Sequence, residues 1–209
     1  IYQQYDYALN KYLGLKKDKI ITFKLEGTNV KKNYDIIRDE LLKYPEIIAI
    51  SGSQNLPINI EQSTIVNDEK GGDSSDDKSI YQLRTDYDFK DVYELNILSG
   101  RYFSRDLNDS INVCLVNKTA AKALGWTPEQ AIGKTISDDW VHGDRKVIGV
   151  VDDFHMHSMH MNIKPMLIEL RGGRFRKFAS IKLSGVKLKE TIARIEQLIS
   201  SHSNYPINY

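Results

Sequence analysis

Length, composition and charge limit what this chain can be. It has 209 residues, of which 41% are hydrophobic, so it can bury the core of one large domain or two small ones. The 29 Lys and Arg residues nearly balance the 28 Asp and Glu residues. No net field therefore draws the whole molecule onto nucleic acid or an acidic membrane, and binding to either would need a local patch. We expect no nucleic-acid partner.

The single cysteine, Cys114, lies in the apolar segment INVCLVN, which predicts a buried strand. One cysteine excludes an intramolecular disulfide, and we expect its thiol in the core. The sequence contains neither a long apolar run nor a signal peptide, so we expect a soluble fragment. Because the chain starts at Ile1 and ends at NYPINY, we also expect it to be part of a longer protein.

The first sixty residues predict a β-α-β unit. The segment IITFKL (20–25) is short and β-branched, and EIIAISGS (46–53) predicts a second, buried strand. Between them an amphipathic helix should end before Pro45, because proline disfavours the α conformation of the preceding residue. Its apolar side chains recur at steps of three and four residues, at Tyr34, Ile37, Leu41 and Tyr44.

Residues 61–79 predict an exposed loop. The stretch NDEKGGDSSDDKS is acidic and rich in Gly and Ser, with no apolar side chain to bury. Asp73, Asp76 and Asp77 could suggest calcium binding. Their spacing lacks the alternating oxygen ligands, the central glycine and the closing glutamate of an EF-hand, so we expect a solvated loop.

The middle of the chain predicts short mixed elements. A small helix, KTAAKALG, should stop at Gly125. Thr127, Pro128 and Gln130 then form a helix-start signature. The apolar run KVIGVVDDF (146–154) predicts a strand.

The C-terminal part predicts two strands and a helix. PMLIEL (165–170) and FASIKL (178–183) read as strands of a hairpin joined by RGGRFRK (171–177), whose Arg171, Arg174, Arg176 and Lys177 should stay solvated. Contact with lipid headgroups or an anionic partner is the alternative for this turn. The apolar face of the final helix should comprise Leu188, Ile192, Ile195 and Ile199.

This layout predicts an α+β fold. The outer parts each have sheet and one amphipathic helix, and each is too small to form a core alone. We therefore expect residues 1–60 and 161–209 to form one discontinuous subdomain (β-α-β plus β-β-α). Residues 61–160 would be a mixed α+β insertion.

Four short motifs follow one another between residues 100 and 160. They are Gly100-Arg101-x-Phe103, an Asn-x-x-Ala-Ala-x-x-Leu-Gly run at 117–125, Ile-Gly-Lys at 132–134, and GVVDDFHMHSMH at 149–160, in which Met159 stands where leucine is usual. In this order they resemble the extracytoplasmic core domain of MacB-like and FtsX-like ABC transporter permeases, most closely the Bacteroidetes type. Residues 7–20 and 190–209 are similar to segments that leave one transmembrane helix and approach the next.

The resemblance implies a porter-like subdomain, with a post-membrane segment at its start, that carries an inserted Sabre-like subdomain. It implies a non-catalytic domain without a cofactor, at the periplasmic face of the bacterial inner membrane, within a multi-pass membrane protein. A cytoplasmic ABC ATPase would hydrolyse ATP, and the membrane helices would relay its conformational change to a pair of permease copies or homologous domains. The further partners implied are a periplasmic adaptor and outer-membrane channel for export, or a cell-wall hydrolase to be activated.

The residues themselves also predict no enzyme. RGGRFRK lacks the spacing and the Lys-hydroxyl ending of a Walker phosphate loop. Ser158 lies between His157 and His160, but sequence neighbours do not make a triad, and no glycine elbow exposes the serine.

The segment VVDDFHMHSMHMN (150–162) raises the alternative of a metal-binding domain. Nitrogen and oxygen donors for zinc or copper(II) would be His155, His157, His160, Asp152 and Asp153, and thioethers for copper(I) would be Met156, Met159 and Met161. If the strand continues, however, His155 and His157 face away from Asp152, and the resemblance itself places histidines at 155 and 160. We expect no metal site. A ligand-sensing domain, the other alternative, would need a preformed pocket with convergent polar groups.

Overall fold

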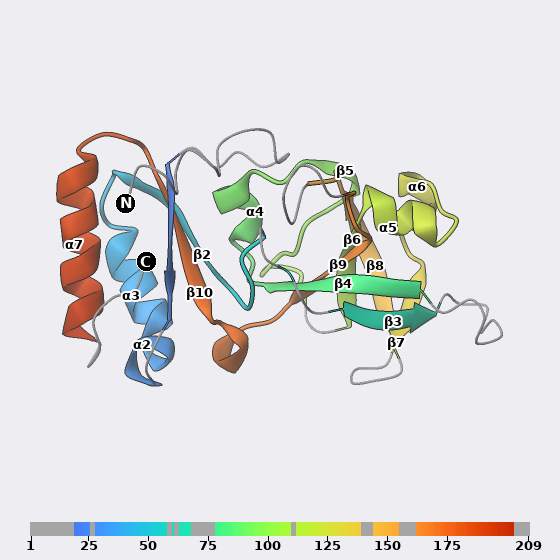
Figure 1. Cartoon of the computed structure of the whole chain (residues 1–209), viewed down its shortest axis with the longest axis horizontal. Coiled ribbons are helices and arrows are strands. Elements are labelled where there is room, and N and C mark those ends of the chain that lie inside the picture. The colour runs from blue at the N-terminus through green and yellow to red at the C-terminus, as the bar shows by residue number, and fades with distance from the viewer. Residues whose placement is uncertain are drawn as a thin grey trace.

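The structure is a computed structural model that describes residues 19–25, 28–57, 60, 63–67, 78–109, 112–138, 144–154 and 162–202. It is a mixed α+β molecule, elongated along one axis (Figure 1), which confirms the predicted fold class. Within these residues, no helix is both long and apolar enough to cross a membrane. Two packed units lie at opposite ends of the long axis.

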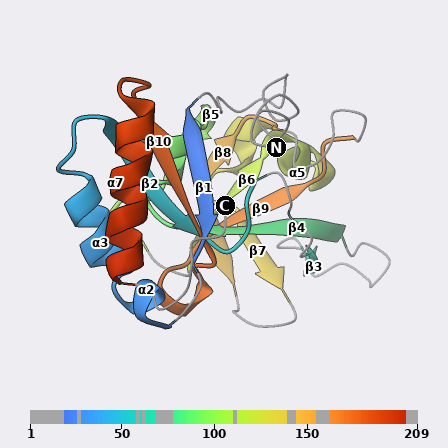
Figure 2. The ribbon, with the colours of Figure 1, turned by 60° about the vertical axis from the view of Figure 1, so that its left-hand side comes forward.

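The first unit, here called the helical layer, combines the start and the end of the chain. Strand β10 (Phe178–Leu183) lies between β1 (Ile20–Lys24) and β2 (Ile47–Ser53) and is antiparallel to both. Helices α2 (Thr28–Lys32), α3 (Tyr34–Leu41) and α7 (Leu188–Ser201) cover one side of these strands (Figures 1 and 2). The first and last parts of the chain thus share one sheet and one core.

The apolar spacing of the sequence explains the core of the helical layer. Tyr34, Ile37 and Leu41 are buried on α3, as predicted, and Ile195 and Ile199 are buried on α7. The predicted place of Leu188 in that face is wrong, because its side chain is 40% exposed. It is the first residue of α7, and Thr191 takes the buried position one turn later.

The second unit, here called the strand ring, is a closed circuit of pairings. Six strands pair in the order β4, β3, β7, β8, β6, β9, and β9 pairs in parallel with β4 to close the circuit. Strand β5 (Ile97–Gly100) pairs with β8 outside it. The bounds of the six are Lys78–Thr85 for β4, Ser63–Asn67 for β3, Thr135–Asp138 for β7, Arg145–Val151 for β8, Val113–Asn117 for β6 and Met166–Leu170 for β9.

Short capped helices accompany the ring. The Asn117 carboxamide oxygen accepts hydrogen bonds from the Ala120 and Met166 amides, both at 2.9 Å, and so ties the start of α5 (Lys118–Ala123) to β9. Thr127 and Gln130 form the predicted capping box of α6 (Pro128–Ala131). Helix α4 (Phe89–Tyr93) packs between the two units, against β2 and β10. Cys114 is fully buried, as predicted, and burial raises the pKa of its thiol to about 12.

The predicted exposed loop at residues 61–79 is wrong in part. Within the predicted loop 61–79, Ser63–Asn67 forms β3, and Lys78 and Ser79 begin β4. The polar composition of residues 61–79 obscured a short alternation of apolar and polar side chains, which buries Val66 in the strand. The calcium alternative at Asp73, Asp76 and Asp77 lies outside the described residues.

The predicted hairpin of β9 and β10 is also wrong. β9 pairs with β4 and β6, whereas β10 pairs with β1 and β2. The connection 171–177, which contains the short helix η2 (Gly173–Phe175), carries the chain from the strand ring to the helical layer (Figure 1). A seven-residue connection imposes no tight turn, so each strand pairs where its apolar face is buried.

Gly149 marks a close approach of backbone segments in the strand ring. A Cβ at this position would lie 2.2 Å from the Arg101 carbonyl oxygen and 2.9 Å from Leu115 Cδ2. We expect Gly149→Ala to lower the free energy of unfolding by about 1–3 kcal/mol, measured by urea denaturation. Gly172→Ala is the matched control, because its nearest neighbour is an Arg176 side-chain atom at 3.5 Å. Equal stability of both variants and the wild type would contradict the packing described.

Candidate functional site

The backbone connection between the two units is narrow. In the sheet it is one residue pair, Ser53 of β2 opposite Thr85 of β4. Neighbouring hydrogen bonds run from the Gln54 amide to the Arg84 carbonyl at 2.9 Å and from the Arg171 amide to the Thr85 carbonyl at 2.7 Å. Because so few backbone hydrogen bonds join the two units, side-chain contacts must set their relative position.

A set of polar side chains gathers beside this connection, and we call it the polar junction. Its centre is the Asp86 carboxylate, which is only 4% exposed and directly follows β4. Helix α3 and strand β2 contribute from the helical layer, and the loop after β5 contributes from the strand ring. The members are Tyr34, Arg38, Ser51, Asp86, Asp88 and Arg105.

Asp86 accepts hydrogen bonds from both sides of the junction. The Ser51 hydroxyl and the Gly52 amide of β2 donate to it at 2.6 Å, the Tyr34 hydroxyl donates at 3.3 Å, and the Asp88 amide donates at 3.1 Å. The Tyr102 hydroxyl, from the strand-ring loop, donates to the Asp86 carbonyl at 3.3 Å. The carboxylate thus joins β2 and α3 to the turn after β4, and the main-chain carbonyl of the same residue adds the strand-ring loop.

Burial has the largest effect on the pKa values of Asp86 and Tyr34. Loss of water raises the pKa of the Asp86 carboxyl, although the hydrogen bonds from Ser51 and Gly52 act the other way. Burial, and then the neighbouring Asp86 charge, hold the pKa of the Tyr34 hydroxyl well above its usual value. Tyr34 therefore remains a hydrogen-bond donor at neutral pH.

Asp88 forms the more exposed edge of the junction. It pairs with Arg38 of α3 at 3.3 Å and with both terminal nitrogens of Arg105, at 2.9 and 2.7 Å. The Arg105 guanidinium also lies 4.6 Å from the centre of the Tyr87 ring. Asp88 therefore joins the helical layer to the strand-ring loop through two arginines.

Helix α4 strengthens the same boundary with apolar and hydroxyl contacts. The Tyr93 and Ser180 hydroxyls lie 2.7 Å apart, which joins α4 to β10, and burial raises the pKa of Tyr93 to about 12. The Phe89 and Tyr93 ring centres lie 4.5 Å apart, with the rings tilted, within a core that also contains Ala49 of β2. The polar junction is thus backed by packed side chains.

A second group of buried charges lies inside the strand ring. Glu169, 2% exposed, accepts from Arg84 at 2.9 Å and from Arg145 at 2.5 Å, and lies 3.5 Å from Arg171. Arg84 also donates to Gln54 at 3.1 Å, next to the single connecting residue pair. Removing one member of this group would leave a buried charge without its partner, which is costly. The group therefore ties the connection at Gln54 to the interior of the strand ring.

The structure gives the connection 171–177 a different role from the one predicted. Arg171 is buried beside Glu169, and Arg176 stacks 4.3 Å from the Tyr34 ring centre and pairs with Asp35 at 3.3 Å. The prediction that these two arginines stay solvated is wrong, because Arg171 is buried beside Glu169 and Arg176 is largely covered by its contacts with Tyr34 and Asp35. Lys177 is exposed, as predicted, and the Arg174 side chain lies outside the described residues.

The candidate metal ligands are only partly described. The Asp153 carboxylate accepts from the Thr119 amide at 2.9 Å and from its hydroxyl at 2.7 Å, so it anchors α5. Asp152 accepts from the Asp153 amide at 2.9 Å. His155, His157 and His160 lie outside the described residues, within which no three His, Cys, Asp or Glu side chains are placed to hold a metal. The expected absence of a metal site stays a prediction.

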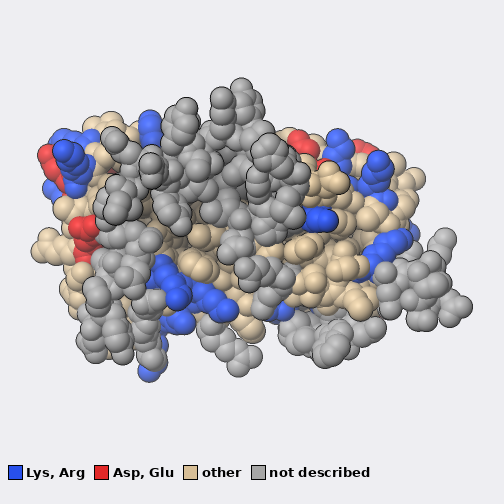
Figure 3. All heavy atoms as spheres, in the orientation of Figure 1, with Lys and Arg blue, Asp and Glu red and all other residues tan. Residues whose placement is uncertain are grey.

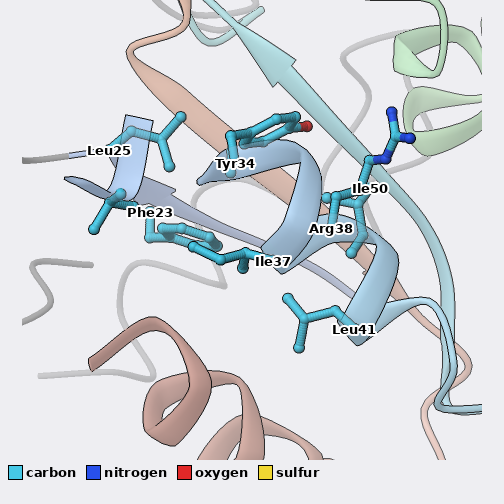
Figure 4. Close-up of a pocket in the computed structure, with 9 residues that line it drawn as sticks. Phe23, Leu25, Tyr34, Ile37, Arg38, Leu41 and Ile50 are labelled. Atoms are coloured by element: carbon cyan, nitrogen blue, oxygen red, sulfur yellow. The ribbon is translucent and has the colours of Figure 1, made fainter. Parts of the chain in front are cut away.

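A small apolar pocket lies under α3. Its lining includes Phe23, Leu25, Ile37 and Leu41, and its volume of about 10 Å³ has room for about one water molecule. Figure 4 shows the Arg38 guanidinium pointing away from these apolar side chains. The pocket therefore offers a small molecule neither space nor converging polar groups.

The pKa of Asp86 gives a test of the junction. Because its folded-state pKa is raised, the folded protein holds this proton more tightly than the unfolded chain does. The stabilisation is therefore complete below the unfolded pKa, about 3.9, and is lost as pH rises through the folded pKa. We expect the stability advantage of wild type over Asp86→Asn to shrink as pH rises from about 4, measured by urea unfolding at successive pH values.

Asp109→Asn is the matched control with the opposite sign. The hydrogen bond from Arg101 lowers the pKa of Asp109, so its contribution is present above the unfolded pKa and is lost as pH falls. The advantage of wild type over this variant should grow with pH. An advantage over Asp86→Asn that also grew with pH would contradict the burial of that carboxylate.

Comparisons with known proteins agree with this architecture. Residues 19–198 match the family model described as the MacB-like periplasmic core domain. No curated protein matches the chain.

Solved structures share the fold at low sequence identity. The periplasmic region of MacB from Actinobacillus actinomycetemcomitans has a TM-score of 0.61 at 18% identity, over 93% of this chain and 88% of that one. The extracellular domain of the noncanonic ABC-type transporter YknZ from Gram-positive bacteria has a TM-score of 0.58 at 13% identity, over 90% and 100%. A domain of a putative permease protein from Porphyromonas gingivalis has a TM-score of 0.58 at 15% identity, over 90% and 86%.

The predicted family and periplasmic location are confirmed. The match spans most of the chain, and it covers both the helical layer and the strand ring. The chain belongs to the family of MacB-like periplasmic core domains, the periplasmic domains of ABC transporter permeases in the inner membrane.

Proposed function

We propose that this domain transmits ATP-driven conformational change from the inner membrane to partners in the periplasm, without catalysing a reaction. The family makes it part of an ABC transporter permease, which works with an ATPase and a second permease copy. The observation that carries the proposal is the polar junction, in which Asp86 joins both units beside a single connecting residue pair.

The junction suits stiff coupling of the two units. A sheet joined by one residue pair bends easily, whereas each buried hydrogen bond that breaks and leaves Asp86 unsatisfied costs about 1–3 kcal/mol. Displacement of the helical layer would therefore move the strand ring with it.

We also propose that the helical layer is the porter-like subdomain and that the strand ring is the inserted Sabre-like subdomain. The predicted boundary near residue 60 falls between β2 and β3, which lie in different units. We move the second boundary from residue 160 into the connection 171–177, because β9 pairs with β4 and β6.

We propose export as the process served, because the matched family is the MacB-like one. A periplasmic adaptor and an outer-membrane channel would then be the partners. A pulldown of the complete permease from its native envelope tests this choice. Recovery of adaptor or channel supports export, whereas recovery of a cell-wall hydrolase in their place supports FtsX-like activation.

Stiff coupling makes a prediction that needs no knowledge of the cargo. Ser63, exposed at the start of β3, can carry a spin label through Ser63→Cys, and the native Cys114 is buried from the reagent. In the complete permease–ATPase assembly, we expect the distance between the labels of the two permease copies to change when ATP binds. With Asp86→Ala this change should be lost while ATP hydrolysis continues.

Two controls separate uncoupling from loss of structure. A label at the exposed Ser200 of α7 should respond to ATP with or without Asp86→Ala, because it lies in the helical layer. Glu40→Ala removes an exposed carboxylate of α3 that pairs with Lys43 on the surface of the helical layer, and should leave the Ser63 response intact. If Asp86→Ala lowers expression, Ser51→Ala removes one hydrogen bond and should reduce the response. An unchanged Ser63 response in both junction variants would contradict the proposal.

A further inference from the structure

Lysines from three chain segments meet at one end of the helical layer. We call this surface the basic end, and its lysines are Lys24, Lys31, Lys32 and Lys177. In Figure 3, Lys and Arg side chains gather at the lower left of the visible face, over the lower ends of β1 and α2. The segments are far apart in the sequence, so only the fold assembles this surface.

Backbone contacts hold the three segments together. Lys24 lies opposite Phe178 in the pairing of β1 with β10, and the Leu25 amide donates to the Lys177 carbonyl at 2.7 Å. Helix α2, which ends with Lys31 and Lys32, packs against η2, just before Lys177. The backbone positions from which the lysines project are therefore fixed relative to one another.

Carboxylates are few in the described part of the basic end. Among the described residues of 19–25, 28–35 and 172–178, the only carboxylate is Asp35, which is already paired with Arg176 at 3.3 Å. The opposite end of the same layer differs, because Glu40, Glu46 and Glu190 lie in the segments that carry its lysines Lys19, Lys43, Lys187 and Lys189. Among the described residues, lysines therefore outnumber carboxylates at the basic end.

We propose that the basic end binds the anionic phospholipid headgroups of the inner membrane's periplasmic surface. Lysine ammonium groups attract phosphate without demanding one geometry, which suits a fluid lipid surface. None of the exposed large apolar residues comes from α2, the end of β1 or the described part of 172–178, so the contact is electrostatic and does not insert into the bilayer.

This inference rests on the proposed function, which places the domain beside the membrane as part of a permease. Attachment to the membrane keeps the domain at a high effective concentration near lipid, so a weak attraction is enough. The contact would hold the helical layer in a defined position on the bilayer, against which the transmitted motion acts.

The test uses the 209-residue chain and lipid vesicles. Co-sedimentation is measured with phosphatidylglycerol–phosphatidylcholine vesicles and with pure phosphatidylcholine vesicles, at low and high salt. We expect binding to the anionic vesicles only, weakening as salt rises. Replacement of the exposed Lys24, Lys32 and Lys177 by Gln should lower binding about 100-fold, since each lysine near an anionic surface contributes about fivefold.

The matched control replaces Lys43, Lys187 and Lys189 by Gln, which removes the same charge from the opposite end. This variant should bind within about threefold of wild type, and both variants should keep the wild-type circular dichroism and unfolding midpoint. Inorganic phosphate at constant ionic strength should not compete, because the proposed ligand is a lipid surface. Equal losses in the two variants, equal binding to neutral vesicles, or displacement by phosphate would overturn the proposal. None of these outcomes involves ATP or the polar junction, so they leave the proposed function to its own test.

Discussion

The buried carboxylate of Asp86 is the constraint on which the relation of the two units depends. It withdraws a titratable group from water, which is costly unless every oxygen finds donors. Those donors come from β2, from α3 and from the turn that follows β4. The Tyr102 hydroxyl of the strand-ring loop donates to the main-chain carbonyl of Asp86. Satisfying one group therefore fixes the positions of segments that the sheet itself joins through one residue pair.

Both units are packed so that a force applied at the polar junction does not deform them. In the strand ring, closure of six strands leaves little freedom for one to slide, and Glu169 with its arginines ties the interior to the connection at Arg84. In the helical layer, α3 and α7 share one core with β1, β10 and β2. Two packed units joined by a small set of buried polar and apolar contacts are a physical basis for transmitting movement without chemistry.

Local signals in the sequence predicted elements, but pairing depends on the whole chain. The spacing of Tyr34, Ile37 and Leu41 and the cap at Thr127 are complete within a few residues, and both are confirmed. The partners of β9 are set by burial inside the ring, so no local pattern revealed them. Asp86 looks like an ordinary turn residue, because the donors that bury it lie more than thirty positions earlier. By contrast, its oxygen donors make Asp153 a candidate metal ligand in the sequence, whereas in the structure its carboxylate anchors α5.

We propose that Asp86 holds the two units in one fixed relation. Spin labels at Ser63 and Ser200 of the same 209-residue chain, one in each unit, measure this directly by double electron–electron resonance. We expect one narrow distance distribution for the wild type and a broad one for Asp86→Ala, whereas the distribution between two labels within the helical layer should keep its width. A distribution equally narrow in both proteins would contradict it, since the connection would then be stiff without the buried carboxylate.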